Sequence, residues 1–266
     1  SKPSTQLSPL LYDLTSLQRE ANSRFGFSAK STLGLAQALY EKHKVLTYPR
    51  TDARALPEDY LPTVRNTLTM LTGEGIGKGH DEGLIARYSP FAHQILARHW
   101  IVPNKRIFNN AKISDHFAII PTLQASKHLS EPEQKLYDLV VKRFLAVFYP
   151  AAEYLLTTRI TRVESEPFKT EGKVLVNPGW LAVYGREGQE GDEGNLVVVK
   201  ANESVKADEV QLNANQTRPP ARYSEATLLS AMESAGRMVD DEELKAAMAG
   251  RGLGTPATRA QIIENL

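Results

Sequence analysis

Apolar positions recur with a helical period near the start of the chain. From 28 to 43 they fall on one face of a helix, which predicts a helix with one buried side; this stripe consists of Leu33, Leu35, Ala36, Leu39 and Tyr40. An earlier helix is predicted to be capped by Thr15, which has capping-box spacing to Gln18, and to end at Gly26. Helix, short turn and helix form the outline of a helix-turn-helix or winged-helix unit, with a plain two-helix core element as the alternative.

The pattern changes to a two-residue period directly after the second helix. Residues 45–48 are predicted as a short strand, and Pro49 places that strand at a sheet edge because proline cannot donate to a ladder. Side chains two apart share one face of a strand, so Tyr48, Arg50 and Asp52 are expected to point the same way. The sequence therefore predicts a phenol, a guanidinium and a carboxylate on one edge, where they can meet a phosphodiester.

The rest of the chain predicts further helices, interrupted by a run of strands. Helices are predicted over 57–71, from the capping box of Ser130 and Glu133 to about 149, over 224–234, and from Thr255 onward. Strands are predicted at 154–163, 168–175, 196–200 and 205–212, with a polar turn region at 187–194. Residues 151–217 are thus expected to form antiparallel β structure.

Three groups of residues that look like ligand sites have simpler explanations. The glycine-rich segment 72–80 lacks the preceding strand and the lysine-serine/threonine ending of a phosphate loop, so we interpret it as a surface loop. The four acidic residues at 240–243 fall at a helix start, where they offset the helix dipole. His80, His93 and His99 have no acidic partner at metal-ligand spacing, and we assign them no role.

Composition limits the function classes. The 266 residues include 32 basic and 31 acidic side chains, which argues against a general polyanion-binding surface, so any nucleic-acid site is expected to be a local groove. The absence of cysteine excludes disulfides, thiolate chemistry and cysteine-ligated zinc. No apolar run of about 18 residues and no leader pattern occur, so we expect a cytoplasmic protein without a membrane partner. Residues 1–5 have the composition of a linker or a cut end.

A nucleophilic tyrosine at position 48 would need help from its surroundings. A phenol titrates near pH 10, so removing its proton at neutral pH costs about 4 kcal/mol. One positive charge about 4 Å away returns about 4 kcal/mol at an effective dielectric near 20. Arg50 can supply that charge and can also bind phosphate oxygens with both arms of its guanidinium. The alternative is that Tyr48 packs by its ring as a β-forming residue and Arg50 is a solvated neighbour.

Four segments, in order, resemble the type IA DNA topoisomerases in the form typical of bacterial topoisomerase III. The first, Thr-Tyr-Pro-Arg-Thr-Asp at 47–52, is similar to the active-site signature of that family. The other three lie at 114–122, 219–228 and 252–260. Because each match alone carries a false-positive risk, the identification depends on their common order, which spans most of the chain.

The resemblance implies a multidomain α+β fold. A helical nucleophile domain at 10–150 would contain the helix-turn-helix or winged-helix-like unit that carries the tyrosine. An antiparallel β hinge domain would follow at 151–217, and the start of a helical ring-closing domain at 218–266. Residues 1–9 would be a linker or the end of the hinge domain.

The resemblance also implies roles for individual residues. Tyr48 would attack one DNA strand, with Arg50 and His116 as the other catalytic residues, and His116 would act as a cation toward phosphate or as a proton shuttle. DNA contacts are implied at Asp52, Ser114, Arg222, Thr255, Thr258 and Arg259. The last three lie at a helix start whose free amides suit a backbone phosphate, with a well-capped helix and nothing more as the alternative. Phe117, where the family often has a polar residue, is left unassigned.

In the family, magnesium is held by an acidic cluster in a preceding domain that also supplies a lysine, and this sequence has no counterpart of that domain. The chain is therefore expected to be an internal fragment that binds no cofactor and is inactive alone. Its parent would be an ATP-independent, monomeric enzyme whose partner is single-stranded DNA, with RNA as a further open substrate. The main alternative is a non-catalytic DNA-binding helix-turn-helix module. A relaxase would need a histidine cluster, and a tyrosine recombinase would need a spread arginine–histidine set; neither pattern is present.

Overall fold

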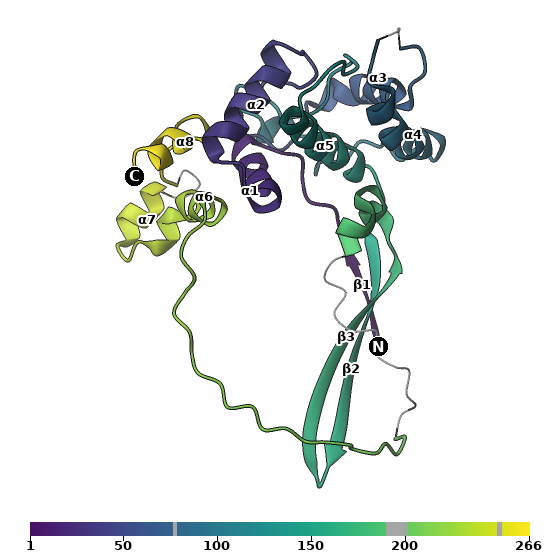
Figure 1. Ribbon diagram of the computed structural model, residues 1–266, viewed down its shortest axis with the longest axis vertical. Coiled ribbons are helices and arrows are strands. Elements are labelled where there is room, and N and C mark those ends of the chain that lie inside the picture. Colours follow the sequence, from purple (N-terminus) through teal and green to yellow (C-terminus); the bar gives the residue numbers. More distant parts are fainter. Residues whose placement is uncertain (77–78, 190–199, 201, 249–251) are drawn as a thin grey trace. The chain divides into compact units, whose positions relative to one another are not determined.

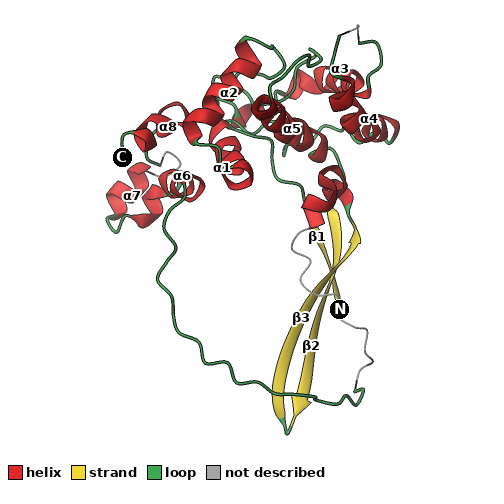
Figure 2. Ribbon diagram, in the orientation of Figure 1, coloured by secondary structure: helices red, strands yellow, loops and turns green. Residues whose placement is uncertain are grey.

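The computed structural model describes residues 1–76, 79–189, 200, 202–248 and 252–266, without the side chains of 186–189, 238 and 247. The chain divides into two compact units. The β unit comprises 1–8 and 150–222, and the helical unit comprises 9–149 and 223–266 (Figure 1). Helices make up most of the helical unit, whereas the long strands lie in the β unit (Figure 2).

The helical unit is assembled from two parts of the chain. Its first part contains α1 (Leu14–Phe25), α2 (Ala29–Glu41), η1 (Glu58–Tyr60), α3 (Leu61–Thr72), α4 (Glu82–Ala97), η2 (Asn110–Lys112) and α5 (Glu131–Ala146). Its second part contains α6 (Glu225–Glu233), η4 (Ala235–Met238), α7 (Glu242–Met248) and α8 (Pro256–Glu264). The two parts meet where α1 packs against α6 and α2 packs against α8 (Figure 1).

The first helix begins two residues earlier than its pattern predicts. Asp13, not Thr15, is the N-cap: its Oδ1 accepts a hydrogen bond of 2.7 Å from the amide of Ser16, and the Ser16 hydroxyl completes the capping box. The prediction failed because an aspartate and two hydroxyl residues lie within four positions, and spacing does not rank them. The ends at Gly26, with φ of 68°, and at Ser28, which caps α2, are confirmed.

The remaining helix predictions are confirmed, and one helix was missed. The segment 57–71 forms η1 and α3, and helices start after Ser130, Ser224 and Thr255 as expected. The acidic residues at 240–243 lie at the start of α7, as interpreted from the sequence. The missed helix is α4, which contains Pro90 and is capped by Asp81. In the predicted loop 72–80, residues 77–78 lie outside the described residues.

The β unit is a three-stranded antiparallel sheet in the order β1 (Lys2–Gln6), β2 (Ala152–Val163) and β3 (Glu166–Asn177). Ser4 pairs with Tyr154, and Leu156 pairs with Lys173. The turn between β2 and β3 consists of Glu164 and Ser165, which both have positive φ, as in a two-residue type I′ hairpin turn. The 3-10 segment η3 (Gly179–Gln189) follows β3, and Gly179 is required there because a Cβ would lie 2.3 Å from the carbonyl oxygen of Ala151.

Two of the four predicted strands are confirmed and one is wrong. The strands predicted at 154–163 and 168–175 are β2 and β3. The strand predicted at 205–212 is not formed: that segment is exposed and has no paired neighbour among the described residues, because alternation without a partner strand does not make a ladder. The strand predicted at 196–200 falls outside the described residues except at Lys200, as does most of the turn region 187–194. Residues 1–5 were interpreted as a linker or a cut end, but residues 2–6 form β1 of the sheet.

The start of α5 is tied to the end of α2 by one carboxylate. The amide and the hydroxyl of Ser130 donate to Glu133 Oε2 at 2.8 and 2.7 Å, and His43 Nε2 lies 3.0 Å from Oε1 of the same residue. Burial disfavours the charged form of Glu133, but these hydrogen bonds outweigh that effect and hold the pKa of the carboxyl below its usual value. The segment that follows α2 and leads to Tyr48 is therefore fixed at its start.

None of the helices in the described part of the chain combines the length and the apolar composition that a membrane crossing requires.

The contact between Glu133 and its partners predicts a pH-dependent stability. Because the pKa of Glu133 is lowered by folding, its stabilising contribution is complete above the carboxyl's usual pKa of 4.5 and is lost as the pH falls through the lower folded value. We expect Glu133→Gln to lower the free energy of unfolding at pH 7 by about 1–2 kcal/mol. The difference from the unmodified chain should shrink below about pH 4.5, measured by urea unfolding at each pH.

Glu131→Gln is the matched control, since Glu131 lies in the same first turn but is exposed and pairs with Lys135. We expect only a small change from it at either pH. Equal losses from the two variants would contradict the role given to Glu133.

Candidate active site

The site is built on two segments that run side by side, 44–55 and 114–122. Backbone amides link them at three levels, from Thr122 to Val45, from Thr47 to Ile120 and from Ala118 to Ala55, each at 3.0 Å. The predicted strand at 45–48 is nevertheless not a strand: the segment forms a single isolated bridge, between Leu46 and Pro121. Regular pairing ends there because neither Pro49 nor Pro121 can donate a ladder hydrogen bond.

Threonine side chains form the hydrogen bonds between the two segments where backbone pairing stops. The Thr47 hydroxyl donates to the carbonyl of Ala118 at 3.0 Å and accepts from the amide of Ile120 at 2.9 Å. The Thr51 hydroxyl donates to the carbonyl of His116 at 2.9 Å and accepts from the amide of Ala53 at 3.1 Å. These two hydroxyls flank Tyr48 in the sequence, so they fix the backbone on both sides of it.

The two-residue period predicted for this segment is confirmed by its burial. Pro49, Thr51 and Ala53 are buried, whereas Tyr48 and Arg50 are half-buried and Asp52 is exposed. The segment is thus extended with one face turned to the core and the other open. The phenol, the guanidinium and the carboxylate lie on the open face.

The structure brings together the tyrosine and histidine that the sequence places 68 positions apart. The rings of Tyr48 and His116 have centroids 4.2 Å apart at an interplanar angle of 43°. Tyr40 packs edge-on with the ring of Tyr48, at 5.5 Å between centroids. Sequence reasoning placed Tyr40 only in the apolar stripe of α2, and no local signal showed that it would support the phenol.

The remaining charged and polar residues of the site differ in whether they have a hydrogen-bond partner in the protein. The Ser114 hydroxyl donates to Asp52 Oδ1 at 3.1 Å, so the two are a pair that ties the segments together at the exposed end. Arg50 forms no hydrogen bond or ion pair with any described residue. A half-buried guanidinium without a protein partner is suited to an oxyanion ligand, because arginine stays charged at all relevant pH values.

Most of the other tyrosines are more buried than Tyr48. Six of the ten are buried, namely Tyr12, Tyr88, Tyr137, Tyr149, Tyr154 and Tyr184. Burial raises the pKa of Tyr88 and Tyr137 well above the usual value and that of Tyr149 to about 12. A polymeric substrate cannot reach these groups, which leaves Tyr40, Tyr48, Tyr60 and Tyr223. Of these four, Tyr48 is the one whose ring packs against a histidine.

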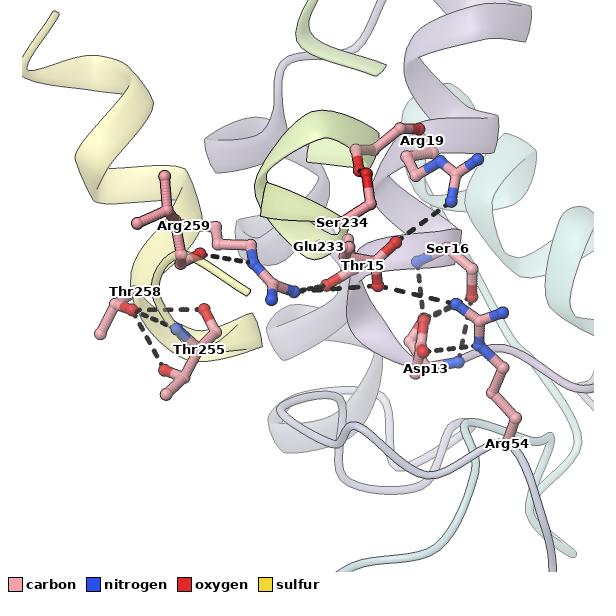
Figure 3. A network of polar contacts seen from close by, with 12 residues as sticks. Asp13, Thr15, Ser16, Arg19, Arg54, Glu233, Ser234, Thr255, Thr258 and Arg259 are labelled. Carbon is pink, nitrogen blue, oxygen red and sulfur yellow. Dashed lines mark hydrogen bonds and ion pairs between the residues drawn. The ribbon is translucent and has the colours of Figure 1, made fainter. Parts of the chain in front are cut away.

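A second polar cluster joins the two parts of the helical unit, with Glu233 at its centre (Figure 3). Glu233 accepts from Arg19 at 3.1 Å and lies 3.7 and 3.8 Å from the guanidinium nitrogens of Arg54 and Arg259. Arg54 also binds Asp13, the cap of α1, at 2.6 Å. Sequence reasoning missed Glu233, because its partners lie up to 214 residues away.

Arg259 is placed inside this cluster. It is 4% exposed, donates from Nη1 to the Thr15 hydroxyl at 3.0 Å and donates from Nε to the carbonyl of Leu253 at 3.0 Å (Figure 3). To bind DNA, its guanidinium would first have to leave these protein contacts. Thr255 and Thr258 are exposed, and the Thr258 hydroxyl accepts from the amide of Thr255 at 2.8 Å, so the well-capped helix is present. Arg222 is exposed and belongs to the β unit, whereas the other candidates belong to the helical unit.

Among the described residues, no three histidine, aspartate or glutamate side chains gather as a metal site would require. The acidic run at 240–243 is used locally, since Asp241 Oδ1 caps α7 by accepting from the amide of Leu244 at 2.8 Å. The side chains of the described residues therefore do not fit a magnesium ion.

Comparisons with known proteins agree on one family. The DNA topoisomerase family model matches residues 1–266. DNA topoisomerase 3 of Bacillus cereus is 42% identical over 276 residues, covering 100% of this chain and 36% of the relative. That of Bacillus subtilis is 44% identical over 269 residues, covering 97% and 35%. Full-length topoisomerase I of Thermotoga maritima superimposes with a TM-score of 0.67 and 25% identity, over 100% of this chain and 39% of that one. The chain thus spans about a third of the length of the curated relatives that it matches.

The contact between Thr15 and Arg259 predicts a specific stability effect. Thr15→Val keeps the shape of the side chain but removes the buried 3.0 Å hydrogen bond that Arg259 Nη1 donates to the Thr15 hydroxyl. We expect the free energy of unfolding of the helical unit to fall by about 1–3 kcal/mol, measured by urea unfolding with far-ultraviolet circular dichroism.

Thr32→Val is the matched control, because Thr32 is equally buried and its hydroxyl has no hydrogen-bond partner among the described residues. It should be neutral or slightly stabilising. A loss from Thr32→Val as large as that from Thr15→Val would show that the threonine shape matters rather than the bond to Arg259.

Proposed function

Because this chain belongs to the DNA topoisomerase family, in its type IA class, we propose that it is the tyrosine-bearing part of an enzyme that cuts one DNA strand, passes DNA through the gap and reseals it. The observation that carries the proposal is the packing of the Tyr48 ring against His116, with the unpaired Arg50 on the same open face. The four sequence segments that resemble type IA enzymes support the same reading. Substrates and activity are proposed here for the whole protein, of which this chain is one part.

The proposed reaction is a transfer of one phosphodiester to the phenol. The Tyr48 oxygen attacks phosphorus and forms a 5′-phosphotyrosyl bond, while the bond from phosphorus to the 3′-oxygen breaks. The phenol proton is lost and the released 3′-oxygen gains a proton, leaving a free 3′-hydroxyl. Reversal of the same step reseals the strand. The covalent link retains the energy of the broken bond, so no ATP is required.

Arg50 and His116 assist this transfer in different ways. Arg50 is positioned to neutralise the phosphate oxygens as charge builds up on them, and it has no competing partner in the described part of the chain. Two roles fit His116, which is exposed and lies against the phenol: as a cation it stabilises the phosphate, and as a base it takes the phenol proton. The threonines at 47 and 51 position the phenol by fixing the backbone on either side of it.

Magnesium is proposed to bind outside this chain. When bound in a type IA enzyme, it would neutralise charge on the DNA backbone, and we propose that other parts of the protein hold it.

Single-stranded DNA is the proposed partner, because a single strand can lie along the extended face of 48–54 and the exposed helix start at Thr255. We further propose that the enzyme acts as a monomer in the cytoplasm.

A non-catalytic DNA-binding module is the competing function. It is favoured by one observation, the α1–Gly26–α2 arrangement, which has the outline of a helix-turn-helix. The two functions differ in whether a covalent adduct forms.

Tyr48→Phe in the complete gene product distinguishes them. The change removes one oxygen and keeps the ring against His116 and Tyr40. We expect no denaturant-resistant adduct on single-stranded DNA, while DNA affinity at fixed salt stays within about threefold, because phosphate contacts come from many groups. Both quantities are measured on the same preparation.

Tyr223→Phe is the control, since Tyr223 is 64% exposed and lies outside the site. It should form adduct normally. Normal adduct from Tyr48→Phe would show that another tyrosine is the nucleophile, and no adduct from the unmodified protein would favour the binding module.

The chain of 266 residues by itself is expected not to relax supercoiled plasmid DNA, with or without magnesium. The reason is that its described side chains form no acidic metal cluster and that it spans about a third of its relatives. Gel electrophoresis of the plasmid, with a complete relative as positive control, measures this. Efficient relaxation by the chain alone would mean that it holds a complete site.

A further inference from the structure

A pocket of about 450 Å³ adjoins the Tyr48 segment, and the proposed function does not use it. Its walls come from segment 44–55, from the end of segment 114–122 and the two residues beyond it, and from η1 and α3. The residues that matter here are Thr47, Tyr60, Ile120, Pro121, Leu123 and Gln124. Its volume lies within the range of about 300–1,000 Å³ that is typical of small-molecule sites.

Two pairs of consecutive residues connect this pocket to the candidate active site. Thr47, which lines it, directly precedes Tyr48, so their α-carbons are about 3.8 Å apart. Phe117 directly follows His116 and packs on Tyr60, with ring centroids 4.8 Å apart. Phe117 was left unassigned from the sequence, and the structure gives it a position between the histidine and the pocket wall. The pocket wall is thus adjacent in the chain to both Tyr48 and His116.

The chemistry of the walls selects against a phosphate. None of the lining side chains carries a formal charge, so the pocket offers no counter-charge to an anion. Ile120, Pro121 and the 54% exposed Leu123 supply apolar surface, and Tyr60 supplies an aromatic ring. Flat, neutral and partly apolar ligands fit such a site, and in a nucleic acid these are the bases.

The polar groups that remain available can read the edge of a base. The hydroxyls of Thr47, Thr67 and Thr122 already donate to backbone carbonyls. By contrast, the Tyr60 hydroxyl and the Gln124 side-chain oxygen have no hydrogen bond to any described residue. Burial, together with the nearby Asp59 carboxylate, raises the pKa of Tyr60, so its phenol remains a donor at neutral pH. The amide of Gln124 has one donor and one acceptor side, which match the N6 and N7 edge of adenine.

We propose that this pocket takes one nucleobase of the single DNA strand bound at Tyr48, with the base stacked on Tyr60 and its edge read by Gln124. Adenine is the favoured base because of the glutamine amide. The proposal rests on the proposed function, since it presumes that a single strand reaches Tyr48. It gives the site a sequence preference at one position of the strand, in addition to the phosphate contacts, which carry no sequence information.

The first test measures binding by the 266-residue chain and does not depend on catalysis. Short oligodeoxyadenylates are compared with oligomers of equal length and charge that lack the bases, by fluorescence anisotropy at fixed salt. We expect Tyr60→Leu to weaken oligodeoxyadenylate binding by about 5- to 150-fold, the range for loss of one base–aromatic stack, and to leave binding of the abasic oligomer unchanged. Gln124→Leu should reduce the preference for adenine over thymine while retaining binding of both.

The controls separate the pocket from the general DNA site and from folding. Phe168→Leu changes an exposed aromatic residue of β3, outside the four segments that resemble the family, and should leave all affinities unchanged. Thermal unfolding of each variant shows whether the fold is intact, and Tyr60→Trp, which keeps an aromatic ring, should restore the affinity lost in Tyr60→Leu. Equal weakening of oligodeoxyadenylate and abasic oligomer, or no weakening of either in a folded Tyr60→Leu, would overturn the proposal.

The second test maps cleavage positions in the complete gene product with randomised single-stranded oligonucleotides. Unmodified protein is expected to show a base preference at one fixed distance from the break, and Gln124→Leu should flatten it. Cleavage with an unchanged preference in Tyr60→Leu and Gln124→Leu overturns the pocket proposal and leaves the role of Tyr48 intact. Absence of any cleavage instead contradicts the proposed function, and the binding test then decides on the pocket.

Discussion

The geometry around Tyr48 depends on two threonine hydroxyls that replace a backbone ladder. Thr47 and Thr51 each donate to a carbonyl of segment 114–122 and each accept from an amide, so each satisfies two backbone groups at once. A regular strand could not pass through Pro49, and an unpaired loop would leave these groups unsatisfied. The result is an extended segment that is held on its core side and leaves its other face free. The amide of Leu14 also binds the carbonyl of Thr51, so the first helix is anchored to the same segment.

The sequence was sufficient to predict the structure wherever contacts between residues close together in the chain determine it. The helix after Ser28, the capping box of Ser130 and Glu133, and the hairpin strands β2 and β3 follow from periodicity and capping chemistry within a few residues. The two-residue spacing of Tyr48, Arg50 and Asp52 predicted that they share one face, and their burial agrees with that prediction although the strand itself is not formed. Pairing of Tyr48 with His116, by contrast, was expected from the family resemblance and not from spacing, since 68 residues separate them.

Predictions failed where a contact with a residue distant in the sequence determines the local structure. Asp13 rather than Thr15 caps α1 because Arg54 holds the aspartate from outside and Arg259 occupies the threonine hydroxyl. The segment 205–212 alternates like a strand but has no neighbour to pair with in the described residues. The cluster around Glu233 joins positions from four regions of the sequence, and nothing local marks the glutamate as shared. Long-range charge pairing of this kind becomes visible only once the helices are packed.

The β2–β3 ribbon has a mechanical consequence. Each strand has 12 residues, about 40 Å of chain, yet burial is concentrated near the end where Ala152 and Tyr154 lie, and most other side chains of β2 and β3 are accessible to solvent. A ribbon held mainly by its own ladder of hydrogen bonds can twist and bend without opening a hydrophobic core, because there is little core to open along most of its length. Deforming it is therefore an elastic process, with a restoring force that grows smoothly, rather than the rupture of a packed interface. The ribbon is therefore deformable along most of its length, and only the Glu164–Ser165 turn and the cross-strand pairs join its two strands there.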